Sequence, residues 1–220
     1  MTTNCAFYFV KAVPLQLILL LSSSNLAYPQ DTSATQLNKS LRSELLKMES
    51  DDQKYRDEVD KTRAMSLTAD EKQKRVSALM EKQARLDRRN LKRLVQIIDK
   101  YGWPGRSLVG KEGSLTAFLI IQHAELEDQK KYFPMLKEAV TRGEANQDYA
   151  ALLEDRILMR EGKKQIYGSQ LHFNEVTKKL ELWPIEDEEN VDVRRASVGL
   201  EPLAEYAKRF GLEYKPLKKK

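Results

Sequence analysis

Two histidines are the first residues to consider for acid–base chemistry, and one has a distinctive setting. His123 stands near the end of an apolar segment, LTAFLIIQHA, that begins at Leu115. An imidazole there serves as a general base or a metal ligand, or it is a hydrogen-bonded structural residue. Glu127 lies one turn further on, but two ligands are too few to define a metal site, so we predict no metal and no cofactor. His172 falls in an alternating segment and is expected to be a cross-strand surface residue.

A charged pair, Asp155 and Arg156, lies on a second predicted helix. Tyr149, Leu152 and Ile157 share one face of that helix, which places Arg156 on or beside the packed face. An interior guanidinium needs a carboxylate or carbonyl partner. Arg156 is therefore either half of a structural ion pair or a clamp for a ligand, and both readings stay open.

Further polar candidates follow towards the carboxyl end. The segment Tyr167-Gly168-Ser169-Gln170 can offer neutral hydrogen bonds, and its glycine permits close approach of a ligand. Asp192 and Arg195 are three residues apart on a predicted helix, so they can pair and stabilise it. Arg194 should point to a different side of this helix. The last cluster comprises Glu186, Asp187, Asp192, Arg194 and Arg195.

One near-match to a phosphate-binding loop is rejected. Residues 105–111 read GRSLVGK, which fits the spacing of such loops. The hydroxyl residue that should follow is replaced by Glu112, and the segment follows a helix and a Trp-Pro turn rather than a buried strand. We interpret it as a glycine-rich connection.

The charge balance excludes some function classes. The 220 residues include 38 basic and 33 acidic ones. Four lysines stand in the tail at 212–220 and one, Lys11, near the start, so the remainder is neutral and no nucleic-acid partner is predicted. The tail is either a solvated terminus or a weak attachment to anionic lipid or polymer. The near-balance of charge and the 41% hydrophobic content argue against a disordered chain.

The beginning of the sequence predicts export. After Lys11 an apolar run, AVPLQLILLL, is followed by small residues up to Ala27. The run is about half the roughly 20 residues of a spanning helix, so residues 1–27 are interpreted as a secretory signal. The only cysteine, Cys5, precedes the run, which argues against a lipoprotein. We expect a periplasmic or secreted protein with no membrane span after cleavage.

The spacing of apolar residues predicts a mainly α fold. A polar linker at 28–36 precedes a hairpin of two long helices at 37–101, in which Thr68 and Glu71 form a capping box. A dimeric coiled coil is the alternative. A compact helical domain follows at 102–211. Its predicted elements are helices at 115–124 (capped by Ser114), 133–142, 147–161 and 191–198 (capped by Asn190), a small β-hairpin within 164–183, and a last helix from Pro202 to Gly211.

Several strings resemble a bacterial family catalogued as domain of unknown function six-six-two-four. They are GWPGRSLVG, QHA, DR, YGSQ, PIED and VDVRRASVGLEPLAEY, within about residues 94–206. The family usually has Asp where Glu125 stands, and Thr at the positions of Glu154 and Ser169. The resemblance implies no reaction, but it implies that one set of polar residues belongs together: His123, Asp155, Arg156, Tyr167, Gln170, Asp187, Asp192, Arg194 and Arg195.

These residues predict a polar pocket. His123 would act as a base that Asp155 orients, and the arginines, Tyr167 and Gln170 would hold a small anionic or envelope-derived ligand, either bound or hydrolysed. The alternative is a non-catalytic interaction module whose helical hairpin binds an envelope protein. Whether the protein is an enzyme stays open at this level.

Overall fold

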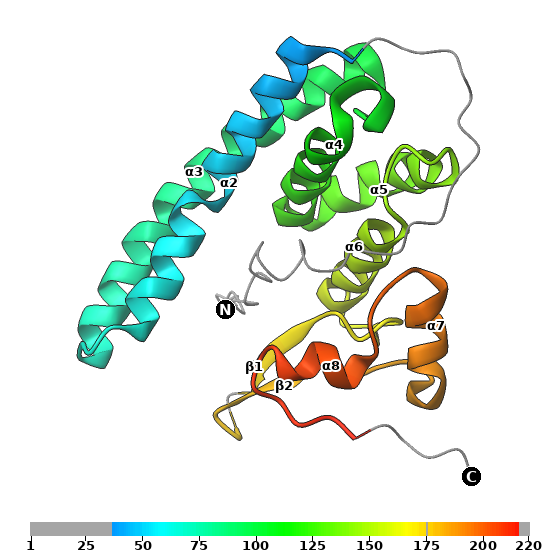
Figure 1. The fold of residues 1–220 in the computed structure, drawn as a ribbon. Helices are drawn as coiled ribbons and strands as arrows, with labels where there is room; N and C mark the ends of the chain where they lie inside the picture. Colours follow the sequence, from blue (N-terminus) through cyan, green and yellow to red (C-terminus); the bar gives the residue numbers. More distant parts are fainter. Residues whose placement is uncertain (1–36, 175, 216–220) are drawn as a thin grey trace, which may run out of the picture. The chain divides into compact units, whose positions relative to one another are not determined.

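The computed structural model describes residues 37–174 and 176–215, and in this part of the chain the fold is mainly α-helical, as expected (Figure 1). The expected signal at 1–27, the linker at 28–36 and the last five residues of the basic tail lie outside these ranges. The elements are α2 (Lys39–Ala64), α3 (Ala69–Tyr101), α4 (Arg106–His123), α5 (Leu126–Thr141), α6 (Gln147–Arg160), β1 (Leu171–Asn174), β2 (Lys179–Leu182), the 3₁₀ turn η2 (Glu188–Asn190), α7 (Val191–Ser197) and α8 (Leu203–Lys208).

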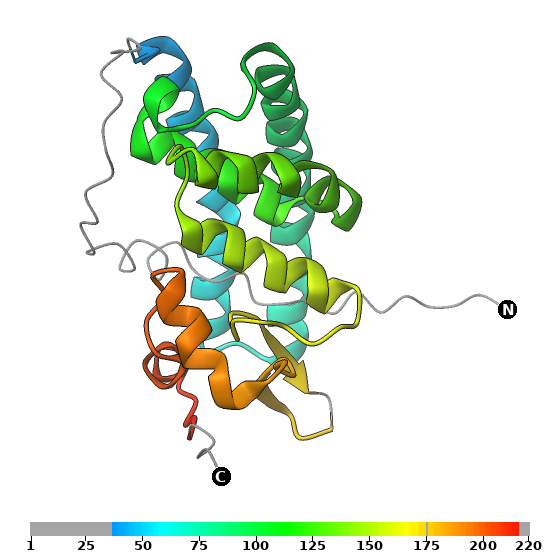
Figure 2. The same ribbon diagram turned by 90° about the vertical axis from the view of Figure 1, so that its right-hand side faces the viewer.

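The long helices α2 and α3 form the expected antiparallel hairpin and run side by side in both views (Figures 1 and 2). The capping box is confirmed: the Thr68 hydroxyl accepts from the Glu71 N–H, and the Glu71 carboxylate accepts from the Thr68 N–H at 3.0 Å. These bonds satisfy donors that the first turn of a helix leaves free. The sequence therefore sets where α3 begins.

Helix α4 begins earlier than expected. It starts at Arg106 after Gly105 and bends at Gly110, whose φ of 75° suits glycine and disfavours other residues. The predicted cap, Ser114, lies inside the helix, and its hydroxyl donates to the Glu144 carbonyl at 3.0 Å. The prediction of Ser114 as a helix cap is therefore wrong, because helical turns lie on both sides of the bend at Gly110 and Ser114 lies inside the second of them. Helix α5 likewise begins at Leu126 rather than 133, with acidic residues in its first turn.

The hairpin and α4 pack into one hydrophobic core, because both long helices contact α4. Leu45, Leu94 and Phe118 are fully buried there. The described chain divides into two compact units, and the boundary between them lies within α6, between Ala150 and Ala151. This division does not coincide with the expected boundary at 101/102, since α4 and α5 group with the hairpin.

The unit after Ala150 contains the predicted small β-hairpin. Strand β1 pairs antiparallel with β2, and His172 lies opposite Glu181, the cross-strand position expected for it. A small core of Leu171, Ile185, Val191, Leu203 and Tyr206 lies beneath. Asn190 precedes α7 as expected, but its side chain donates to the Asp187 carboxylate instead of capping the helix.

Candidate acid–base site

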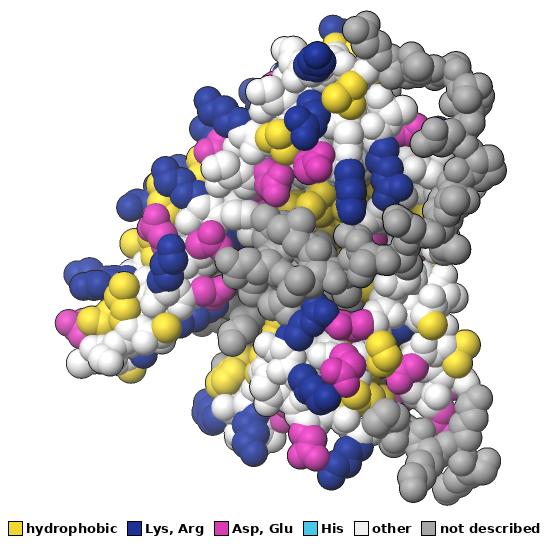
Figure 3. Space-filling view, in the orientation of Figure 1, with side chains coloured by type: hydrophobic (Ala, Val, Ile, Leu, Met, Phe, Trp, Pro, Cys, Tyr) yellow, Lys and Arg dark blue, Asp and Glu magenta, His cyan; other side chains and the backbone are white. Residues whose placement is uncertain are grey.

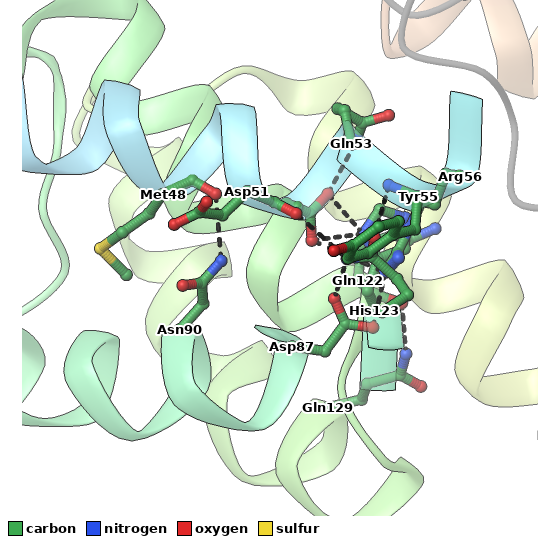
Figure 4. Close-up of polar contacts among 12 residues, drawn as sticks. Met48, Asp51, Gln53, Tyr55, Arg56, Asp87, Asn90, Gln122, His123 and Gln129 are labelled. Atoms are coloured by element: carbon green, nitrogen blue, oxygen red, sulfur yellow. Dashed lines mark hydrogen bonds and ion pairs between the residues drawn. The ribbon is translucent and has the colours of Figure 1, made fainter. Parts of the chain in front are cut away.

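His123 is the last residue of α4, and its ring faces α2 (Figure 4). Its Nδ1 lies 3.0 and 2.9 Å from the two carboxylate oxygens of Asp52. Asp52 is 1% exposed and the His123 side chain 8% exposed, so the pair is largely removed from water. An ionised carboxylate can only accept, so Nδ1 carries the proton and donates to Asp52. In the neutral ring, Nε2 then holds the lone pair.

A second carboxylate joins the pair through an arginine. The Arg56 guanidinium lies 3.6 Å from Asp52 Oδ1 and 2.9 Å from Asp87 Oδ2. His123, Asp52, Arg56 and Asp87 thus form a row of alternating charge when the ring is protonated, built from α4, α2 and α3. We call these four residues the acid–base row.

The side-chain amide of Gln83 joins α3 to the backbone of α2 beside the acid–base row. Its Oε1 accepts from the Tyr55 N–H at 3.0 Å, and its Nε2 donates to the Asp51 carbonyl at 3.3 Å and to Asp87 Oδ1 at 2.7 Å. An α-helix normally pairs the first two of these groups with one another. Gln83, which is fully buried, therefore reaches into the backbone ladder of α2 beside Asp52.

The two carboxylates of the row have opposite pKa shifts. Burial raises the pKa of Asp52, but the pairing with His123 and Arg56 outweighs burial and leaves the pKa below its ordinary value. For Asp87, burial is the larger effect and raises the pKa to about 6 despite the Arg56 ion pair and the Gln83 hydrogen bond. Neighbouring titratable groups whose pKa values are driven apart are typical of acid–base sites.

Sequence reasoning missed Asp52, Arg56 and Asp87, although a signal for Asp52 was present. The apolar series on α2 steps from Leu45 to Met48 and then needs a residue at 52 before Val59. A carboxylate at a core position of a helix needs a partner, which is a reason to search for one. Nothing in the sequence identifies His123 as that partner.

The other predicted residues lie in the unit after Ala150, where Asp155 organises a loop. Its carboxylate accepts from the backbone N–H groups of Ile166 at 2.7 Å, Tyr167 at 3.0 Å and Ser169 at 2.9 Å. Asp155 is therefore not the residue that orients Nδ1 of His123, and Asp52 takes that position. The sequence could not reveal this, because both are acidic residues on helices and only the packing separates them.

The two arginines of α7 hold the same loop by its carbonyl groups. Arg194 donates through Nε to the Ile166 carbonyl at 2.9 Å, and Arg195 donates to the Tyr167 carbonyl at 2.6 Å. The Tyr206 hydroxyl donates to the Ser169 carbonyl at 2.7 Å. Residues 166–169 are thus clamped from both sides.

The remaining predicted residues have local partners. Gln170 donates through its side chain to the Ser169 hydroxyl at 2.9 Å and through its backbone N–H to Gln165 Oε1 at 2.7 Å. Asp187 pairs with Arg194 at 3.1 Å, which confirms that Arg194 points away from Asp192. Asp192 accepts from the Leu203 N–H at 2.7 Å, and its charge also favours the protonated guanidinium of Arg195. Arg156 is buried, as its place on the packed face indicated.

The structure thus brings most predicted residues of the second unit around one loop, and gives His123 a different partner set in the first unit. Among the described residues, no group of three or more His, Cys, Asp or Glu side chains has the arrangement of a metal site. In the same ranges no helix is long and apolar enough to cross a membrane.

The family model of DUF6624, described as a family of unknown function, matches residues 39–219. The chain belongs to this family. The match includes α2 and α3, which corrects the narrower extent of about 94–206 and brings Asp52 inside the family region. No curated protein and no solved structure matches the chain.

Proposed function

We propose that this DUF6624 member is an acid–base catalyst whose reacting group is His123. The observation that carries the proposal is the contact of both Asp52 oxygens with Nδ1, at 3.0 and 2.9 Å in a nearly buried setting. A carboxylate in this position fixes the tautomer and stabilises the imidazolium that forms during proton transfer. Nε2 is then the nitrogen that takes up and returns the proton.

The reaction class that suits this arrangement is metal-independent hydrolysis or acyl transfer. Nε2 would accept a proton from water as the water oxygen bonds to the acyl carbon, and would return it to the leaving group as that bond breaks. The pKa of Asp87 near 6 gives the row a second group that exchanges protons close to neutral pH. The substrate we favour is an envelope-derived or extracellular compound.

The arginines that the sequence suggested as ligand-binding residues have other partners in the fold. Arg194 and Arg195 donate to backbone carbonyl groups of their own loop, so they are not proposed as clamps for an anionic ligand. In the second unit the polar set supports a rigid loop rather than direct ligand contact.

Hydrolysis of simple chromogenic substrates tests the proposal. The full chain is assayed with p-nitrophenyl acetate, p-nitrophenyl phosphate and alanine p-nitroanilide. His123→Gln is expected to lower the rate for the accepted substrate by about 100- to 10,000-fold, because general acid–base catalysis contributes in this range. Asp52→Asn is expected to lower it as well, since the asparagine cannot stabilise the imidazolium.

The matched control is His172→Gln, which removes the other histidine from a strand and is expected to leave the rate unchanged. Circular dichroism establishes that each variant is folded. A folded His123→Gln variant with the wild-type rate, or a wild type inactive on all three probes, would contradict the proposal.

We also propose that the chain is exported to the periplasm or secreted. Support comes from the sequence alone, in the order of Lys11, the apolar run and the small residues up to Ala27.

A non-catalytic interaction module remains the second candidate. It is favoured by the loop at 166–169, because the side chains of Asp155, Arg194 and Arg195 form hydrogen bonds with the backbone of this loop. Their polar groups then serve the fold of the chain. In this case the Asp52–His123 pair only fastens α4 to the hairpin, and His123→Gln lowers stability without affecting any reaction.

A further inference from the structure

Charge is distributed unequally between the two helices of the hairpin. Helix α2 carries seven basic and seven acidic residues, whereas α3 carries ten basic and five acidic ones. The near-neutral balance of the chain as a whole therefore conceals a locally basic element. Because α3 is one continuous helix, its excess charge is held in a fixed arrangement.

The excess lies on the side of α3 that faces away from the core. Successive residues of a helix are 100° apart, which places Lys74, Arg85 and Lys92 within about 20° of one line. Gln83 and Asn90, both buried, lie on the opposite side. All three basic side chains of the line are exposed, and the line is about 27 Å long at 1.5 Å per residue.

Further cations flank this line, and few anions do. Lys82 and Arg88 are exposed beside it. Between residues 74 and 92 Glu81 is the one acidic residue of α3 in this sector, and Asp70, Glu71 and Asp99 lie in the sector beyond the two ends of the line. Two other arginines at the edge of the sector are already engaged with α2. These are the pairs Arg89–Asp51 and Arg93–Glu44. We call Lys74, Lys82, Arg85, Arg88 and Lys92 the basic face of α3, and Figure 3 shows Lys and Arg side chains along the outer edge of the hairpin.

We propose that the basic face of α3 binds the surface of an anionic lipid bilayer. The charge is complementary, and each Lys or Arg held near such a surface contributes to binding. A line of cations along one side of a helix can meet a flat surface along its whole length at once. Single-stranded nucleic-acid sites usually present aromatic side chains on which bases stack, and the line itself has none. Tyr55 of α2 lies beside the basic face, with the ammonium groups of Lys54 and Lys82 over its ring.

The binding would be adsorption without insertion. The apolar face of α3 is turned to the core, where Leu94, Ile97 and Ile98 are buried, so it is not available to enter the bilayer. Attraction between exposed charges is screened by salt, with a Debye length of about 10 Å at 0.1 M. The proposed binding is therefore salt-sensitive, and it is independent of the acid–base chemistry at His123.

Vesicle sedimentation with the full chain tests the proposal. The probes are phosphatidylcholine vesicles with and without phosphatidylglycerol. Wild type is expected to sediment with the anionic vesicles at low salt and to be released at high salt. The variant Lys74→Glu/Arg85→Glu/Lys92→Glu is expected to bind the anionic vesicles at least about tenfold more weakly, from the loss and reversal of three charges.

The matched control reverses three exposed lysines on α2, Lys39→Glu/Lys47→Glu/Lys61→Glu, with the same change in net charge. It is expected to retain most of the binding. The lysine-rich end is identical in all three proteins, so a difference between the two triple variants reports on α3. Equal weakening of both variants, no binding of wild type to anionic vesicles, or binding to duplex DNA in preference to vesicles would overturn the proposal.

Discussion

Asp87 shows at the scale of single residues how burial and pairing compete. It has an arginine at 2.9 Å and a glutamine amide at 2.7 Å, yet its pKa rises to about 6 because desolvation is the larger effect. Asp52, with His123 and Arg56 as partners, shifts in the opposite direction although it is more deeply buried. The partner set therefore decides the sign of the shift for each carboxylate.

Asp87 predicts a specific pH dependence of stability. Its pKa is higher in the folded chain than the ordinary 3.8, so between pH of about 4 and 6 the folded state binds the proton more tightly than the unfolded state. The contribution of Asp87 to the free energy of unfolding falls as pH rises through this window. Relative to Asp87→Asn, wild type is expected to lose about 2 to 3 kcal/mol between these pH values.

Urea unfolding at several pH values measures this difference. Asp57→Asn, at an exposed position of α2, controls for the loss of one negative charge. A constant difference between wild type and Asp87→Asn from pH 4 to 7 would mean that burial does not dominate at this residue.

At the scale of elements, the loop at 165–170 is held by its surroundings rather than by its own sequence. Asp155 from α6 binds its N–H groups, and Arg194 and Arg195 from α7 bind its carbonyl groups. Gly168 has a φ of 71°, and a Cβ atom there would lie 2.9 Å from Leu203 and 3.1 Å from Ile185. This glycine therefore permits close packing of the loop on the small core, which replaces the earlier expectation of a ligand approach.

Gly168→Ala is expected to destabilise the protein more than Gly162→Ala does. Both glycines have φ near 70°, so both variants suffer the same backbone strain, but nothing lies within 4 Å of a Cβ at Gly162. The difference isolates the packing clash, for which we expect about 1 to 3 kcal/mol. Thermal or urea unfolding of the two variants measures it. Equal losses would show that Leu203 and Ile185 can move aside without cost.

At the scale of the whole molecule, the two compact units divide the candidate chemistry. The acid–base row belongs to the unit before Ala151, whereas the clamped loop belongs to the unit after it. The family match at 39–219 covers both. Each unit has its own buried apolar core, so each can hold its polar residues in a fixed geometry.

The export proposal predicts the start of the processed protein. Expressed with residues 1–27 in place in a Gram-negative host, the protein is expected in the periplasmic or secreted fraction, and its first residue there is expected to be Tyr28. Intact-mass spectrometry of that fraction checks both statements. Full-length protein confined to the cytosol would contradict export, and a uniform start at another residue would contradict only the cleavage position.

The sequence by itself determined the helical hairpin, the start of α3 and the β-hairpin. These depend on local signals, namely the period of apolar residues, the Thr68–Glu71 capping box and the alternation before and after Asn174. The start of α4 was not determined locally. Gly105 and Gly110 predict breaks, and Gly110 is one, but the residues between them are helical where α4 packs on the hairpin.

Only the tertiary structure decided the partners of the polar residues. His123 and Asp52 are 71 residues apart, and Tyr167 and Arg195 are 28 apart. A buried charged group needs a partner of opposite charge or a hydrogen-bonding partner, but the sequence contains many acidic and basic residues that could be this partner. The choice among them follows from which helix faces meet in the core, a property of the assembled fold.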